Sequence, residues 1–94
     1  MRLYWLAADQ GHADAQYKLG LCYNTGIGVA KDETEAVRLY RLAADQGYAS
    51  AQYGLGWCYR HGTGVRKDEA EAVRLYPLAA DQGDAYAKYA LNSL

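Results

Sequence analysis

Residues 36–71 read AVRLYRLAADQGYASAQYGLGWCYRHGTGVRKDEAE, and the residues on either side of this stretch repeat the same text. When residues 1–36 are set over residues 37–72, about 25 of the 36 positions are identical, and the match resumes at Ala72 with AVRLYPLAADQG. An internal repeat with a period of roughly 20 to 50 residues is typical of stacked-unit architectures. The sequence therefore predicts a chain built from copies of one short unit.

Each copy contains two segments of helical character. The segments before Gly11, Gly47 and Gly83, which we call B helices, have high helix propensity and end where a glycine can adopt a positive φ. The segments after these glycines, which we call A helices, carry apolar residues at helical spacing. Because one short unit cannot bury its own apolar face, the copies must stack. We expect an all-α solenoid of antiparallel helix pairs, with about six helices in the order B-A-B-A-B-A and a 36-residue period.

The spacing of small and apolar residues predicts which face of each helix is buried. In the second B helix the expected apolar face consists of Ala36, Val37, Tyr40, Ala43 and Ala44. In the first A helix it consists of Ala15, Leu19, Cys22, Tyr23 and Gly26. A glycine inside a helix costs about 1 kcal/mol relative to alanine. The recurrence of Gly20 at Gly56 therefore indicates that the helices approach each other closely at this position.

Three carboxylates lie close together where the second B helix begins. Asp32, Glu33 and Glu35 follow the turn TGIGVAK, and Asp68, Glu69 and Glu71 repeat the pattern. Such a group can bind a metal or act in acid–base chemistry, but Asp32 and Glu35 also have the spacing of a helix cap, and Glu33 suits the positive end of the helix dipole. We interpret the group as a cap. The Gly-x-Gly in the turn follows a helix and lacks the full spacing of a phosphate-binding loop.

The third B helix contains a proline, Pro77, where the earlier copies carry Trp5 and Arg41. A proline inside a helix removes one hydrogen bond and clashes with the preceding turn, at a cost of about 3 kcal/mol. We therefore predict a kink or a local break at residues 73–76.

Composition and charge narrow the classes of partner. With 51% hydrophobic and 22% charged residues the chain has the composition of a globular protein. It has no apolar run of the roughly 18 residues that a membrane span needs, and the N-terminus has no signal-like core. The net charge of −1 gives no field that favours nucleic acid. We expect neither a membrane nor a nucleic-acid partner, and a cytoplasmic location if the chain is complete.

The side chains that commonly carry chemistry form no recognisable site in the sequence. Cys22 and Cys58 are equivalent in successive copies, so stacking should hold them about 8–10 Å apart, too far for a disulfide. We expect two free thiols in the core. His12 and His61 have no partners at metal-ligand spacing, and no nucleophile–base set can be assembled. We expect no metal, no cofactor and no catalytic residues.

One pattern runs through both copies: A-x-x-x-L-G-x-x-Y-x-x-G-x-G-V-x-x-D-x-x-x-A-x-x-x-Y-x-x-A-A-x-x-G, from Ala15 to Gly47 and again from Ala51 to Gly83. This pattern closely resembles the Sel1-like repeat, a relative of the tetratricopeptide repeat. The resemblance implies a right-handed superhelix that acts as an adaptor or scaffold for other proteins, without catalysis. It divides residues 1–94 into a partial B helix at 1–11, repeats at 12–47 and 48–83, and a partial A helix at 84–94. Some bacterial members carry two bridged cysteines per repeat, whereas this chain has one.

Positions that differ between the copies are candidates for partner binding. The variable positions of the A helices are spaced by four, three and four residues and form a strip beside the core face. The resemblance implies that this strip lines a concave groove. Its candidate residues, with Arg60 beside them, are Asp14, Lys18, Leu21, Thr25, Ser50, Trp57, Arg60 and His61. Trp57 is the strongest candidate, because large aromatic residues are typical binding anchors.

Several interpretations remain open. The strip can also vary because nothing constrains it, and the recurring tyrosines are interpreted as structural ladders. The main hypothesis is that the strip binds a protein or a peptide. The alternative is self-assembly, in which the last A helix of one molecule docks on the first B helix of another and buries Leu3, Tyr4 and Leu91.

Overall fold

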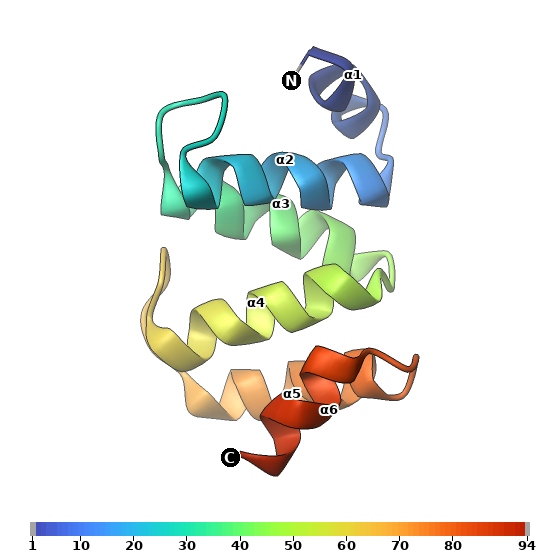
Figure 1. Ribbon diagram of the computed structural model, residues 1–94, viewed down its shortest axis with the longest axis vertical. Helices are drawn as coiled ribbons and strands as arrows, with labels where there is room; N and C mark the ends of the chain where they lie inside the picture. Colours follow the sequence, from blue (N-terminus) through green and yellow to red (C-terminus); the bar gives the residue numbers. More distant parts are fainter. Residues whose placement is uncertain (1, 94) are drawn as a thin grey trace.

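The computed structural model describes residues 2–93, and in this part of the chain all regular structure is α-helical (Figure 1). The helices are α1 (Arg2–Asp9), α2 (Ala13–Thr25), α3 (Glu33–Asp45), α4 (Ala49–His61), α5 (Glu69–Ala80) and α6 (Ala85–Asn92). Thus α1, α3 and α5 are the B helices and α2, α4 and α6 are the A helices, which confirms the predicted all-α repeat solenoid. The predicted helical positions Met1 and Leu94 lie outside the described residues.

The helices follow one another along the long axis of the molecule, from α1 at one end to α5 and α6 at the other (Figure 1). The molecule measures 37 × 24 × 17 Å along its principal axes, and each helix packs mainly on its neighbours in the sequence. Within residues 2–93, none of the helices has the length and apolar character that crossing a membrane requires.

The predicted core faces are largely confirmed. All five residues of the B-helix face, from Ala36 to Ala44, are buried, and Leu39 joins them. On α2, Ala15 and Leu19 are buried, whereas Cys22 and Tyr23 remain partly exposed. The prediction is wrong for Gly26, which is exposed because it ends the helix with a left-handed φ of 77°. Alanine dominates these faces because its small side chain lets neighbouring helices approach, so that leucine and tyrosine can fill the remaining space.

The recurring glycines mark the closest approach of an A helix to a B helix. A Cβ atom placed on Gly20 would lie 2.7 Å from Cε1 of Tyr40, and one on Gly56 would lie 2.8 Å from Cε1 of Tyr76. Real Cβ atoms do not come so near, so both positions exclude every residue larger than glycine unless the tyrosine ring moves. The predicted close approach is confirmed.

The glycine-rich loop that contains Gly64 packs back on the preceding repeat. Gly64 has φ +72°, and a Cβ atom there would lie 2.3 Å from the backbone oxygen of Glu33 and 3.0 Å from Cγ2 of Val37. This loop buries Val37, which is 5% exposed, whereas the equivalent Val73 is 49% exposed. The loop of one repeat thus completes the core of the repeat before it.

The acidic groups act as helix caps. Asp32 Oδ1 accepts a hydrogen bond of 3.1 Å from the backbone N–H of Glu35, and Asp68 accepts the equivalent bond from Glu71. Arg38 pairs with Glu35 at 2.6 Å, so these carboxylates already have partners. The interpretation as caps is confirmed.

Of the kink or local break predicted at residues 73–76, the break is wrong and the kink stays a prediction. The helix α5 continues from Glu69 to Ala80 with Pro77 inside it. Proline cannot donate the usual backbone hydrogen bond to Val73, but its fixed φ suits a helix. Val73 and Arg74 are exposed, so this turn lies at the surface, where water can solvate the freed carbonyl group.

Buried glutamines connect successive helices, a role that the repeat pattern does not predict. Gln16 on α2 donates a side-chain hydrogen bond of 3.3 Å to the carbonyl of Ala8 in α1 and accepts one of 2.7 Å from Gln46 after α3. Gln52 repeats both contacts, with Ala44 and Gln82. The only sequence signal was that these glutamines recur in register.

Candidate functional site

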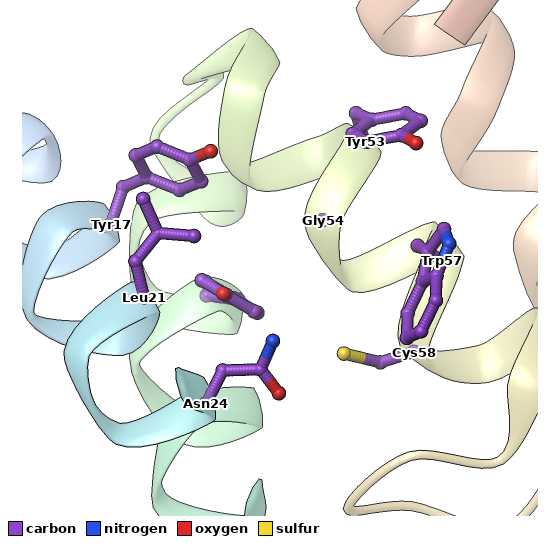
Figure 2. Close-up of a pocket in the computed structure, with 8 residues that line it drawn as sticks. Tyr17, Leu21, Asn24, Tyr53, Gly54, Trp57 and Cys58 are labelled. Atoms are coloured by element: carbon purple, nitrogen blue, oxygen red, sulfur yellow. The ribbon is translucent and has the colours of Figure 1, made fainter. Parts of the chain in front are cut away.

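A pocket of about 190 Å³ opens between α2 and α4, on the side that carries the variable strip (Figure 2). Helix α2 supplies Tyr17, Leu21 and Asn24; helix α3 supplies Tyr40; helix α4 supplies Tyr53, Gly54, Trp57 and Cys58. In Figure 2, Asn24 and Cys58 point toward each other from opposite walls. Of the predicted site residues, Leu21 and Trp57 therefore meet at this pocket.

Tyrosine rings form much of the wall. Tyr17 packs on Tyr40 with ring centroids 5.7 Å apart, and Tyr53 packs on Tyr76 at 5.8 Å. The predicted structural stacking is present. Three of these rings, Tyr17, Tyr40 and Tyr53, also line the pocket, a second role that their regular recurrence in the sequence concealed.

Trp57 and His61 form one edge of the site. Their rings pack at a tilt of 43° with centroids 4.2 Å apart, and both side chains are exposed. Arg60 turns the other way: its guanidinium donates to the hydroxyl of Ser93 at 3.1 Å and to the carbonyl of Ser93 at 3.2 Å. Arg60 therefore lies in the next space, between α4 and α6.

Asp14 and Lys18 form an ion pair of 3.3 Å beyond the pocket. Tyr48 donates a hydrogen bond of 2.7 Å to Asp14 Oδ1. This hydrogen bond, with a smaller contribution from Lys18, lowers the pKa of the Asp14 carboxyl group. Ser50 is half-buried near the start of α4, and it lines neither this pocket nor the second hollow described next.

A second, more open hollow of about 390 Å³ lies between α1 and α2. It is lined by Tyr4, Lys18, Leu21, Cys22, Thr25 and Ile27. Leu21 borders both hollows, so it separates them. The hydroxyl of Thr25 donates to the carbonyl of Leu21 at 2.8 Å and is thus engaged within its own helix.

The pocket between α2 and α4 is suited to apolar contact. Both cysteines are free thiols, as predicted, and burial raises the pKa of the Cys58 thiol to about 11. Burial also raises the pKa of Tyr40. Both groups therefore stay neutral at physiological pH. Within residues 2–93, no three His, Cys, Asp or Glu side chains come together in a way that can hold a metal ion.

Comparison with known proteins gives one family. The family model described as Sel1 repeat matches residues 13–48 and 49–84. A crystal structure of a Sel1 repeat protein from Oxalobacter formigenes is 43% identical and covers 99% of this chain and 70% of that chain, with a TM-score of 0.95. Cysteine rich protein B of Helicobacter pylori is 27% identical and covers 92% of this chain and 65% of that one, with a TM-score of 0.86.

Two further relatives are much longer than this chain. The c5321 protein, a protective antigen of uropathogenic Escherichia coli, is 44% identical over 89% of this chain and 18% of its own, with a TM-score of 0.87. The DAP3-binding cell death enhancer 1 of Rattus norvegicus is 41% identical over 38 residues. These are 40% of this chain and 8% of the rat protein, so the chain spans only a small part of that relative.

Proposed function

The chain belongs to the Sel1 repeat family, whose members generally serve as protein-interaction scaffolds, and we propose that it binds a peptide or partner protein on its A-helix face without catalysing a reaction. The observation that carries this proposal is the aromatic pocket between α2 and α4, with Trp57 at its edge. The proposed contact residues are Asp14, Lys18, Leu21, Thr25, Ser50, Trp57, Arg60 and His61.

The properties of this face suit protein binding. Exposed aromatic residues beside well-packed pockets often contribute most of the binding energy at protein interfaces. Trp57 has this setting, because it is 38% exposed and lies against the tyrosine-lined pocket. The rat relative is named as a DAP3-binding protein. That name supports a protein as the class of partner here, and no particular partner follows from it.

The test compares Trp57→Ala with a matched control, Trp5→Ala. The two indoles are almost equally exposed, at 38% and 37%, but Trp5 lies on α1 and lines neither hollow. Affinity capture followed by mass spectrometry should find a partner with the wild type and with Trp5→Ala, but not with Trp57→Ala. The purified partner should then bind in the same order by calorimetry. Equal binding by the two variants, with equal circular dichroism, would overturn the assignment of the face.

Self-association is the second candidate, and exposed apolar residues at the two ends favour it. Leu3 and Tyr4 on α1 are exposed, as are Tyr86 and Tyr89 on α6. Leu91, which is predicted to be buried by this contact, already packs partly on the buried residues of α5 and α6. Large exposed apolar patches commonly mark interaction sites. In this alternative, α6 of one molecule docks on α1 of another, covering Leu3, and head-to-tail contacts of this kind extend into open filaments unless they close into a ring. Sedimentation velocity at increasing concentration tests it: association that Leu3→Lys abolishes supports it, and a monomer at every concentration excludes it.

A further inference from the structure

The repeat offers an internal comparison, because the space between α2 and α4 has an equivalent between α4 and α6. Shifting the pocket residues by one 36-residue period replaces Gly54 by Ala90, Asn24 by Arg60 and Trp57 by Ser93. The tyrosine at the base of each space is the same, Tyr40 in the first and Tyr76 in the second.

Packing does not require a glycine at position 54. The ring of Tyr40 lies between Gly20 and Gly54, and a Cβ atom on Gly20 would overlap it at 2.7 Å. A Cβ atom on Gly54 would lie 3.6 Å from the nearest ring carbon, an ordinary contact. The equivalent residues, Lys18 and Ala90, show that the helix accepts a side chain here. Gly54 instead leaves free space beside the Tyr40 ring, which lines the pocket although Tyr40 is only 2% exposed.

The replacement of Asn24 by Arg60 closes the equivalent space between α4 and α6. Arg60 reaches across from α4 to α6 and donates to both the hydroxyl and the carbonyl of Ser93. Tyr76 beneath is fully buried, and its hydroxyl group has no hydrogen-bond partner among the described residues. In the first space the shorter Asn24 points into the pocket instead (Figure 2). One space is therefore open and its equivalent is bridged.

We propose that Gly54 and Asn24 make the space between α2 and α4 a socket for one bulky apolar side chain of a partner protein, and that Gly54 sets which side chains fit. This inference rests on the proposed function and specifies how the partner is held. A volume of about 190 Å³ lies below the roughly 300 to 1,000 Å³ of pockets that enclose whole small ligands. It suits a single tryptophan, phenylalanine or leucine side chain.

None of the residues that line the pocket is charged, but the end of α4 that follows Trp57 and Cys58 is basic. Arg60 and His61 form the last turn of α4, where α4 carries no acidic residue. The partners of Arg60 are the uncharged oxygen atoms of Ser93, so its positive charge is not neutralised by them. The charge of Lys18, in contrast, is balanced by Asp14. The partner segment therefore carries acidic residues next to its apolar anchor.

The probes are short synthetic peptides with a central tryptophan, leucine or alanine flanked by glutamates or by lysines. In nuclear magnetic resonance titrations of the full chain, the glutamate-flanked tryptophan or leucine peptides should shift the amide signals of Leu21, Asn24, Gly54 and Trp57. The alanine peptides should not. Tighter binding of the lysine-flanked peptides, or shifts confined to other residues, would overturn the proposal.

The decisive variant is Gly54→Ala, because its effects on stability and on binding should have opposite signs. Replacing a helical glycine without a steric clash should raise the Tm, whereas the added methyl group should weaken peptide binding about tenfold. Gly54→Lys, which copies the residue of the first A helix, should abolish binding while circular dichroism stays unchanged. A higher Tm with unchanged peptide affinity would overturn the socket.

A gain-of-function variant tests the same idea in the second space. Ala90→Gly combined with Arg60→Asn should open the space between α4 and α6 and add a second set of shifted signals, around Trp57 and Tyr89. Unchanged signals there would contradict the role of these two positions. If the socket fails while partner capture still depends on Trp57, the proposed function stands and only this inference falls.

Discussion

At the scale of single residues, the same amino acid has two different effects on one tyrosine. Gly20 allows α2 to lie directly against the ring of Tyr40, whereas Gly54 lies on the other side of that ring, in ordinary contact, and leaves space for the pocket. Gly20 is needed because any larger residue would clash with Tyr40. Gly54 is not needed for packing, but it leaves the space that forms the pocket. Both glycines lower the helix propensity, so the sequence does not distinguish their roles. The distances to neighbouring atoms do.

Alanine substitutions should reveal this difference as opposite changes in stability. Gly20→Ala forces a Cβ atom against Tyr40 and should lower the free energy of unfolding by about 1–3 kcal/mol. Gly54→Ala meets no clash and should raise it by about 0.5–1 kcal/mol. Urea denaturation followed by circular dichroism measures both. If both substitutions changed the free energy of unfolding in the same direction, the packing described around Tyr40 would be contradicted.

Asp14 offers a second residue-scale test, through its hydrogen bond with Tyr48. Because this bond lowers the pKa of Asp14 in the folded protein, it stabilises the fold above the ordinary pKa of aspartate. The contribution is lost as the pH falls through the lowered value. In Tyr48→Phe the pKa of Asp14 should rise, as measured by carbon-detected titration of the carboxyl group. The wild type, titrated under the same conditions, serves as the reference, and an unchanged pKa of Asp14 would rule out the bond as the cause.

At the scale of helices, local signals placed the elements well. The glycines that end helices, the Asp–x–x–Glu caps and the helical spacing of alanines predicted the order and approximate bounds of all the helices found in residues 2–93. Pro77 is the exception. The free-energy cost of proline inside a helix does not break α5, because the rest of this helix is packed. Ala72, Leu75 and Ala79 bury one face of this helix and keep it continuous.

Removing the proline should therefore increase stability without changing the helix. In Pro77→Ala an N–H group becomes available to the carbonyl of Val73, and the free energy of unfolding should rise by about 1–3 kcal/mol. Arg41→Ala, at the equivalent position of α3, gains no such bond and loses the contact between Arg41 and Tyr59. This control should be unchanged or less stable. Equal stability of Pro77→Ala and the wild type in urea would mean that α5 accommodates proline without cost.

At the scale of the whole molecule, buried glutamines couple one repeat to the next. Gln52 on α4 bonds to the carbonyl of Ala44 in α3 and accepts a bond from Gln82 beyond α5. In Gln52→Ala both of these hydrogen bonds are lost, although the carbonyl of Ala44 keeps its bond from the N–H of Gly47. At about 0.5–1.5 kcal/mol for each net hydrogen bond, the loss should cost about 1–3 kcal/mol. Gln10→Ala, which changes an exposed glutamine, should have little effect. Hydrogen exchange should show faster opening of both α3 and α5 in Gln52→Ala; a change confined to α4 would argue against coupling.

The repeat explains how much of this molecule could be predicted from its sequence. Comparing copies identified the core faces, because positions such as Leu19 and Leu55 are identical, and it identified the strip, because Leu21 and Trp57 differ. It could not show that Arg60 turns toward Ser93 while Asn24 points into a pocket, since the direction of a side chain depends on the helix opposite. It also missed Tyr17 and Tyr53 as pocket residues, because their regular recurrence resembled a purely structural role.

The two tryptophans give the array its own optical reporters. Trp5 meets Tyr23 edge-on, with ring centroids 6.0 Å apart, at the beginning of the stack, whereas Trp57 lies over His61 at the pocket. Indole fluorescence depends on its immediate surroundings, so the emission of Trp5 follows the packing of α1 on α2. The emission of Trp57 follows the occupancy of the pocket and its contact with the His61 ring. A chain that keeps only one of these indoles thus reports on a single interface, without any added label.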